Sequence, residues 1–223
     1  MNGLIIINKP KEFTSNDAVQ KMRKILNTKK VGHTGTLDPN ATGVLPILVG
    51  KGTKLSKYLI EHNKTYIGVI KLGRRTDTGD VKGNTIEEKE VNTSMLTKEN
   101  INNILKTFMG KQKQIPPIYS SIKKDGKKLY EYARAGIEVE IDPRDIEIYN
   151  IQLIEINLDE SKITYEVECS KGTYIRVLSE DIAKKLSTVR IFRRTYKNKS
   201  KWIYARKCKY IWRARKRQRK HRK

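Results

Sequence analysis

One short segment gathers most of the side chains that could do chemistry. Residues 32–46 read GHTGTLDPNATGVLP, with three glycines, two prolines, one histidine and a single carboxylate, Asp38. Because glycine and proline interrupt both helices and central strands, this composition predicts an ordered loop that displays a few polar groups. Asp38 is the only acid between Asp17 and Glu61, in an interval rich in lysine. Such a carboxylate is either an ion-pair partner or a reactive group.

Few other residues offer a reactive group or a metal site. The histidines and cysteines are scattered and lack the spacing of zinc ligands. Two distant cysteines give no disulfide framework and favour a reducing compartment. Neither the P-loop pattern nor the dinucleotide-binding glycine pattern occurs, so we expect no cofactor and no metal. These residues are His33, His62, His221, Cys169 and Cys208.

The charge indicates a polyanionic partner. The 223 residues carry 48 Lys+Arg and 24 Asp+Glu, a formal net charge of +24, which is typical of proteins that bind nucleic acid. No apolar run reaches the roughly 18 residues of a membrane span, and no signal peptide is evident. We therefore expect a cytoplasmic protein without a membrane partner.

The positive charge is concentrated at one end. Residues 190–223 contain 17 Lys+Arg and no acid, whereas residues 1–189 have the mixed charges of an ordinary globular domain. Blocks of like charge are usually disordered and often bind other molecules. We expect a folded domain over 1–189 and a disordered tail over 190–223.

Periodicity predicts the elements that must position these residues. Ile163, Tyr165, Val167 and Cys169 alternate with polar residues, which predicts a half-buried strand. Strands and helices do not alternate strictly, so we expect an α+β fold rather than a doubly wound one. Further strands are expected at 4–8, 64–72 and 146–156, and helices after Thr14, after Thr97 and over 175–186.

The chain resembles the TruB family, the bacterial tRNA pseudouridine synthases. Residues 32–46 look like the central motif of that family, and further matches run in order from about residue 3 to 189. The resemblance implies a mixed, largely antiparallel central sheet with flanking helices and a thumb-like insertion at about 111–140. The further matches are Lys9-Pro10 with Thr14-Ser15, Lys64-Thr65-Tyr66, residues 75–80, residues 116–120, residues 123–127 and residues 172–176.

The resemblance also implies a reaction and a substrate. Family members isomerise a uridine in the T-arm loop of tRNA, at position 55, to pseudouridine. The reaction breaks the N1–C1′ bond and rejoins uracil through C5, so it needs a nucleophile but no redox cofactor. We expect the chain to act on tRNA as a monomer.

Residue roles follow from the same resemblance. Asp38 would be the nucleophile, Arg176 would orient its carboxylate, and Tyr66 would stack on the flipped base. Each has a plainer alternative: an Asp-Pro turn for Asp38, core packing for the tyrosines, a loop histidine for His33 and a solvated face for the lysines. The residues expected to bind substrate are His33, Tyr174, Lys64, Lys123 and Lys127.

Two features depart from the family pattern. Glu12 stands where the family has glycine. After Leu186 the tail replaces the remaining catalytic segment and a small RNA-binding domain. One AT-rich coding of 190–199, read one base later, gives Gly-Tyr-Leu-Glu-Glu-Leu-Ile-Arg-Thr-Lys, which is typical of the family. A shifted reading frame near codon 190 would explain the tail; a genuine basic RNA-binding arm is the alternative.

Three readings of the whole chain therefore remain. The first is a tRNA pseudouridine synthase. The second is a catalytically impaired remnant that still binds RNA. The third, a basic protein of ribosomal type, agrees with the composition but does not account for the loop around Asp38.

Overall fold

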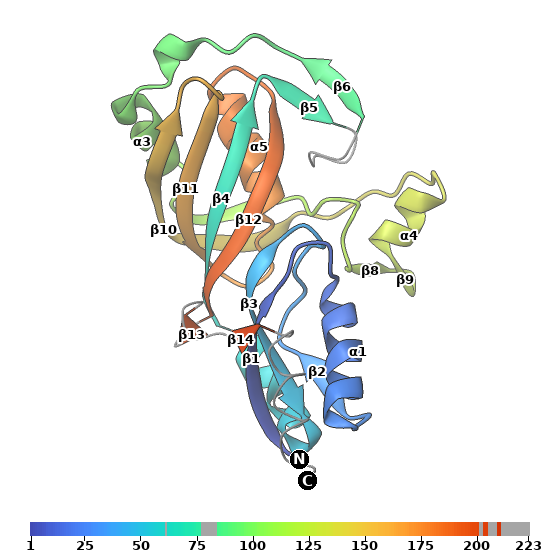
Figure 1. Ribbon diagram of the computed structural model, residues 1–223. Coiled ribbons are helices and arrows are strands. Elements are labelled where there is room, and N and C mark those ends of the chain that lie inside the picture. Colours follow the sequence, from blue (N-terminus) through green and yellow to red (C-terminus); the bar gives the residue numbers. More distant parts are fainter. Residues whose placement is uncertain (61, 77–83, 201–202, 205–208, 211–223) are drawn as a thin grey trace. The chain divides into compact units, whose positions relative to one another are not determined.

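The computed structural model forms two compact units (Figure 1). Unit 1 comprises Met1–Ile67 and Arg194–Lys223, and unit 2 comprises Gly68–Arg193. Motif residues 77–80, Cys208 and His221 lie outside the described part of the chain. The described residues are 1–60, 62–76, 84–200, 203–204 and 209–210.

Unit 1 is a sheet with one long helix packed on it. Its strands follow the order β14-β1-β3-β12, and β2 pairs with β3. β1 and β3 are antiparallel, whereas β12 is parallel to β3. Aliphatic side chains of α1, β1, β2 and β3 share one core. The elements are β1 (Gly3–Lys9), α1 (Ser15–Leu26), β2 (Val31–His33), β3 (Thr42–Val49), η1 (Gly50–Leu55), α2 (Ser56–Ile60), the start of β4 (Lys64–Leu72), the end of β12 (Arg190–Ser200), β13 (Ile203–Tyr204) and β14 (Lys209–Tyr210).

The start of α1 is built as the sequence predicts. The Thr14 hydroxyl accepts the backbone N–H of Asp17 (3.0 Å), and the Asp17 carboxylate accepts the N–H of Thr14 (2.9 Å). This capping box satisfies two donors that the first helical turn leaves without partners. Hydrogen bonds from the side chain and the backbone of Thr14 to the carboxylate lower the pKa of Asp17. The cap fixes the register of α1, and Ser15 is buried.

The glycine-rich segment is less loop-like than predicted. Residues 32–46 were expected to form a loop throughout, but Thr42–Val49 is strand β3 and every one of its residues is buried. Gly43 makes this possible because a Cβ there would lie 2.4 Å from the carbonyl oxygen of Lys197 in β12. Pro46 still contributes its carbonyl, which accepts the N–H of Thr34 (3.3 Å). The irregular part is therefore the shorter stretch 34–41.

Unit 2 is an antiparallel sheet with two helices packed on it. Its strands follow the order β4-β11-β10-β7. β11 buries alternate residues, which confirms the predicted half-buried strand. α3 packs against β10 and α5, both visible in Figure 1. The elements after β4 are β5 (Arg74–Thr76), β6 (Thr85–Glu88), η2 (Thr93–Met95), α3 (Lys98–Lys106), β7 (Gly110–Gln114), β8 (Lys123–Lys124), β9 (Lys127–Lys128), α4 (Leu129–Arg134), β10 (Arg144–Asn157), β11 (Lys162–Cys169) and α5 (Ile175–Lys185).

A lysine hairpin and a short helix form the insertion between β7 and β10. Lys123 pairs with Lys128 and Lys124 with Lys127 across β8 and β9. The turn residues Asp125 and Gly126 both have positive φ (49° and 81°), as a two-residue hairpin requires. α4 follows directly, so the expected insertion with its own short helix is present (Figure 1).

The first part of the tail departs from the expected disorder. Residues 190–200 form β12, which pairs with β3 at Tyr196↔Thr42 and Lys197↔Gly43. Thr195 and Lys197 are buried. Charge composition alone predicts disorder, whereas the backbone donors and acceptors of β3 provide a partner that pairs with this segment whatever its charge.

The mixture of parallel and antiparallel pairs and the flanking helices confirm the α+β prediction. Among the described residues no helix is long and apolar enough to cross a membrane.

Candidate active site

Asp38 begins a tight turn in the irregular stretch 34–41. Its carbonyl oxygen accepts the backbone N–H of Ala41 (3.0 Å), and Pro39 occupies the position where proline favours a turn. Asp38 itself is half-buried, whereas Leu37 and Ala41 are buried in the core of unit 1. The Asp-Pro turn is therefore real, and it presents the carboxylate from a backbone whose neighbouring residues are packed. We call residues 37–41 the Asp38 turn.

Two groups, one just before α1 and one at its first residue, bind the backbone on either side of Asp38. The Ser15 hydroxyl accepts the N–H of Leu37 (2.9 Å), and its own O–H lies 3.4 Å from the Leu37 carbonyl. The N–H of Glu12 donates to the carbonyl of Pro39 (2.8 Å). Because the residues before and after Asp38 are both fixed, its carboxylate has a narrow range of positions.

Lys9 completes this arrangement from the end of β1. Its side chain is fully buried, and the ammonium donates to the carbonyls of Pro10 (2.9 Å), Phe13 and Pro39 (3.1 Å). An ammonium has three N–H donors, so all three are used. Burial lowers the pKa of Lys9 to about 8, against the negative charges of Asp38 and Asp17, which raise it. Lys9 therefore carries a positive charge at neutral pH close to the Asp38 carboxylate.

Glu12 has the backbone conformation of a glycine. Its φ is 68°, in the left-handed region that disfavours residues with a Cβ. This explains why glycine is suited to the position, since only the N–H of residue 12 is needed to bind Pro39. Glutamate in place of glycine at residue 12 thus keeps the hydrogen bond to the carbonyl of Pro39, but its backbone is strained.

His33 lies at the end of β2, before the irregular stretch. It is half-buried, and its Nδ1 accepts the N–H of Gly35 (3.2 Å). Burial lowers the pKa of His33, and the charge of Lys197 lowers it further. The imidazole is therefore neutral at pH 7. The plainer alternative for His33 was a histidine whose hydrogen bonds stay within its own loop, and the bond to Gly35 agrees with that alternative.

Lys64 and Tyr66 lie at the start of β4. Lys64 is 9% exposed, and its ammonium donates to the carbonyl of Ile60 (3.2 Å). Tyr66 is half-buried and packs against the core of unit 1. The plainer alternative, a strand tyrosine half in the core, thus describes the packing of Tyr66. Base stacking would require the part of the Tyr66 side chain that remains accessible to solvent.

The predicted Arg176 and Tyr174 lie in unit 2, at the start of α5. Both are half-buried, and the Nη2 of Arg176 donates to the carbonyl of Tyr119 (3.1 Å). The backbone of Tyr174 is bound by the side chain of Gln114 through two hydrogen bonds (2.8 and 3.2 Å). Unit 2 therefore presents a fixed arginine and tyrosine next to one another on the first turn of a helix.

The predicted lysines of the insertion are exposed. Lys123 and Lys127 lie on opposite strands of the hairpin. Lys124 instead donates to the carbonyl of Glu140 (2.6 Å) and Lys128 to the hydroxyl of Tyr130 (3.2 Å). The two lysines named from the sequence are thus the more accessible members of the four.

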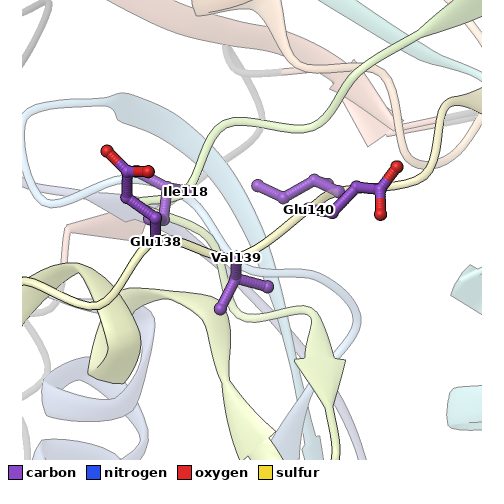
Figure 2. A pocket seen from close by; sticks show the side chains of 5 residues that line it. Ile118, Glu138, Val139 and Glu140 are labelled. Atoms are coloured by element: carbon purple, nitrogen blue, oxygen red, sulfur yellow. The ribbon is translucent and has the colours of Figure 1, made fainter.

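A pocket in unit 2 is lined by other residues. It has a volume of roughly 450 Å³ and is lined by Ile118 and residues 138–141. Figure 2 shows the carboxylates of Glu138 and Glu140 pointing away from each other. It contains none of the predicted site residues, and its negative rim does not suit an anionic substrate.

Sequence reasoning missed the roles of two residues. Lys9 was noted only as part of the Lys9-Pro10 motif, and its burial was not predicted. Gln114 had no signal, because its partner Tyr174 lies 60 residues away. Within the described residues no group of three or more potential ligands could bind a metal ion.

Comparison with solved structures defines the class of the protein. The chain is similar to a chain in the crystal structure of a Cbf5-Nop10-Gar1 complex, with 27% identity and a TM-score of 0.67, over 89% of this chain and 48% of the other. This similarity indicates that the two chains share a fold. A family model, TruB family pseudouridylate synthase (N terminal domain), matches residues 23–175. The chain therefore belongs to the TruB family.

Curated relatives agree. The tRNA pseudouridine synthase B of Bacillus subtilis (strain 168) is 51% identical over 189 residues, which cover 83% of this chain and 61% of the relative. That of Shouchella clausii (strain KSM-K16) is 50% identical over 186 residues, 82% of this chain and 61% of the relative. The chain thus spans 61% of the length of these relatives.

Proposed function

We propose that this chain converts one uridine in the T-arm loop of tRNA to pseudouridine, with Asp38 as the nucleophile. The observation that carries the proposal is a lone carboxylate on a turn whose flanking residues are bound by Lys9, Glu12 and Ser15. Membership of the TruB family and relatives named tRNA pseudouridine synthase B support the same chemistry.

The reaction needs no net change in electrons. The carboxylate of Asp38 forms a transient covalent adduct with the substrate, the N1–C1′ bond breaks and a C5–C1′ bond forms. The C5 hydrogen leaves as a proton, N1 gains a proton, and the carboxylate is released unchanged. No metal or cofactor enters the proposed reaction.

Unit 2 and the rest of unit 1 supply the proposed substrate contacts. Arg176 would orient the Asp38 carboxylate, and Tyr66 would stack on the flipped base. The exposed lysines of the hairpin would contact phosphates of the T-arm. The proposed contacts to the RNA are His33, Lys64, Lys123, Lys127 and Tyr174, in a protein that acts as a monomer.

Tritium release tests the reaction. The protein is mixed with tRNA that carries tritium at uracil C5, and released tritium is counted, since bond formation at C5 expels that hydrogen. We expect release by the wild type and none by Asp38→Asn. Asp17→Asn is the matched control, because it removes another acid of unit 1 whose side chain binds the N–H of Thr14 and no residue of the Asp38 turn in a hydrogen bond described above. Release by Asp38→Asn at the wild-type rate would exclude Asp38 as nucleophile.

A second candidate is an RNA-binding remnant without activity. It is favoured by one observation, the acid-free composition of residues 190–223, which departs from the family pattern. Absence of tritium release at high protein concentration, with tRNA binding intact, would establish this reading.

The tail has its own test. We infer a shifted reading frame near codon 190 from the acid-free composition of 190–223. Sequencing the DNA across codons 180–200 decides it, since an intact frame in independent reads makes the tail, including β12, a genuine part of the protein.

A further inference from the structure

The helix that carries Arg176 lacks a cap of its own. Tyr174 is the N-cap residue of α5, and its side chain makes no capping hydrogen bond. Tyrosine is also outside the group of residues that cap helices well. Its carbonyl accepts the first helical hydrogen bond, from Leu178 (3.1 Å). Another part of the chain must therefore fix the start of this helix.

Gln114 instead fixes the backbone of the N-cap residue itself. Its Oε1 accepts the N–H of Tyr174 (2.8 Å), and its Nε2 donates to the carbonyl of the same residue (3.2 Å). An amide side chain is uncharged and offers a donor and an acceptor in one plane, which suits both groups of a single peptide backbone. Gln114 is only 6% exposed, so water does not readily replace these bonds.

Gln114 is itself in a fixed position. It is the last residue of β7 and pairs with Arg144 of β10. Five residues later, the carbonyl of Tyr119 accepts the Nη2 of Arg176 (3.1 Å). The stretch 114–119 thus contacts the start of α5 twice, through a side chain at Tyr174 and through a backbone carbonyl at Arg176.

We propose that Gln114 is a positioning residue for the reaction: it sets the backbone of Tyr174 and, through the first turn of α5, the direction of the Arg176 guanidinium. The inference rests on the proposed function, in which Arg176 orients the Asp38 carboxylate. Misplacement of such a group by about 1 Å can lower a rate about 100-fold. Gln114 need not touch the substrate to have this effect.

The main test separates turnover from binding and stability. Gln114→Met keeps the length of the side chain and removes both hydrogen bonds. We expect kcat for tritium release to fall about 10- to 100-fold, while KM for tRNA stays within about twofold. Gln112→Met is the matched control, because Gln112 lies on the same strand and donates instead to the carbonyl of Phe108 (2.6 Å). Its kcat should equal that of the wild type.

A second variant adds a signature in pH. In Gln114→Glu, a protonated carboxyl offers one donor and one acceptor, as the amide does, whereas an ionised one opposes the Tyr174 carbonyl. Burial favours the protonated form. The kcat of Gln114→Glu relative to the wild type should therefore rise as pH falls, whereas the ratio for Gln114→Met should stay flat.

The outcomes distinguish the two proposals. If the wild type releases tritium and Gln114→Met has the wild-type kcat, or only melts at a lower temperature, the role of Gln114 is wrong and the proposed function stands. A flat ratio for Gln114→Glu across pH also contradicts the role. If the wild type releases no tritium, both proposals fail.

Discussion

The Asp38 turn and the lysine hairpin both display charged side chains, but they are built in opposite ways. The backbone around Asp38 is bound by a buried ammonium, a buried hydroxyl and a main-chain N–H. In the hairpin (residues 123–128) four lysines face one another across two short strands, and Lys123 and Lys127 are exposed. Like charges opposite each other destabilise a hairpin.

The difference follows from the two tasks. A nucleophile must be placed to within a fraction of an ångström, which calls for buried hydrogen bonds with fixed partners. A phosphate contact requires only a nearby positive charge and tolerates motion. We therefore expect changes at the Asp38 turn to alter stability and turnover, and changes at the hairpin to alter RNA affinity alone.

The largest effect is expected from Lys9→Met. The variant removes the ammonium that donates to the carbonyls of Pro10, Phe13 and Pro39, the last of which keeps the N–H of Glu12, and this loss should lower the free energy of unfolding by about 1–3 kcal/mol. The loosened turn should also lower kcat. Lys11→Met is the control at an exposed position, where a change within about 0.5 kcal/mol is expected. Urea unfolding of both variants measures this, and equal stabilities would remove the contrast between the two regions.

The buried ammonium also gives a defined dependence on pH. The pKa of Lys9 is lowered to about 8 in the folded protein from 10.5 when exposed. Between these values the unfolded chain binds more protons, so the contribution of Lys9 to stability is present above 10.5 and is lost as pH falls through about 8. The stability of the wild type minus that of Lys9→Met should therefore rise from pH 8 to 10.5 and be flat below.

The hairpin is tested by the paired change Lys123→Ala and Lys127→Ala. Affinity for tRNA should fall about tenfold, and the slope of log affinity against log salt should drop by about 1–2. The melting temperature should not fall, because like charges are removed from a hairpin. Lys98→Ala with Lys106→Ala on α3 is a control of equal charge, for which we expect the smaller loss of affinity. Titrations at several salt concentrations decide between the two pairs.

The smallest effect is expected at two residues with a left-handed backbone conformation, Glu12 next to the Asp38 turn and Asp125 in the lysine hairpin. Glu12→Gly should relieve strain at φ 68° and stabilise the protein by up to about 1 kcal/mol while keeping the N–H that binds Pro39. Asp125→Gly in the hairpin turn should change little, since Asp tolerates this conformation (φ 49°). Thermal melts compare them. A loss of stability in Glu12→Gly would mean that its side chain matters more than its strain.

Much of the fold was predictable because the signals are local. The capping box at Thr14 and Asp17 and the alternation of β11 were confirmed residue by residue. The loop predicted for 32–46 was wrong in its second half, because Gly43 and Pro46 enter a strand when the neighbouring backbone fits around them. Residues 190–200 likewise form a strand despite their charge.

In the candidate site, too, some residues were predicted from the sequence and others were found only in the structure. Sequence motifs named Asp38, Tyr66, Tyr174 and Arg176, and their roles remain predictions that the proposed experiments test. The groups that bind their backbones, namely Ser15 for the Asp38 turn and Gln114 for Tyr174, came only from the structure. A sequence motif shows which side chains are present. It does not show which distant side chain hydrogen-bonds to the backbone of each of them.

By itself, the sequence determined the order of the motifs, the α+β class and the presence of one carboxylate in a basic, glycine-rich segment. Only the tertiary structure decided that Lys9 is buried against Pro39, that residue 12 takes a left-handed backbone and that Gln114 binds the start of α5. The physical reason is that helix and strand periodicity depends on residues a few positions apart. Burial and long-range hydrogen bonds depend on how the whole chain packs.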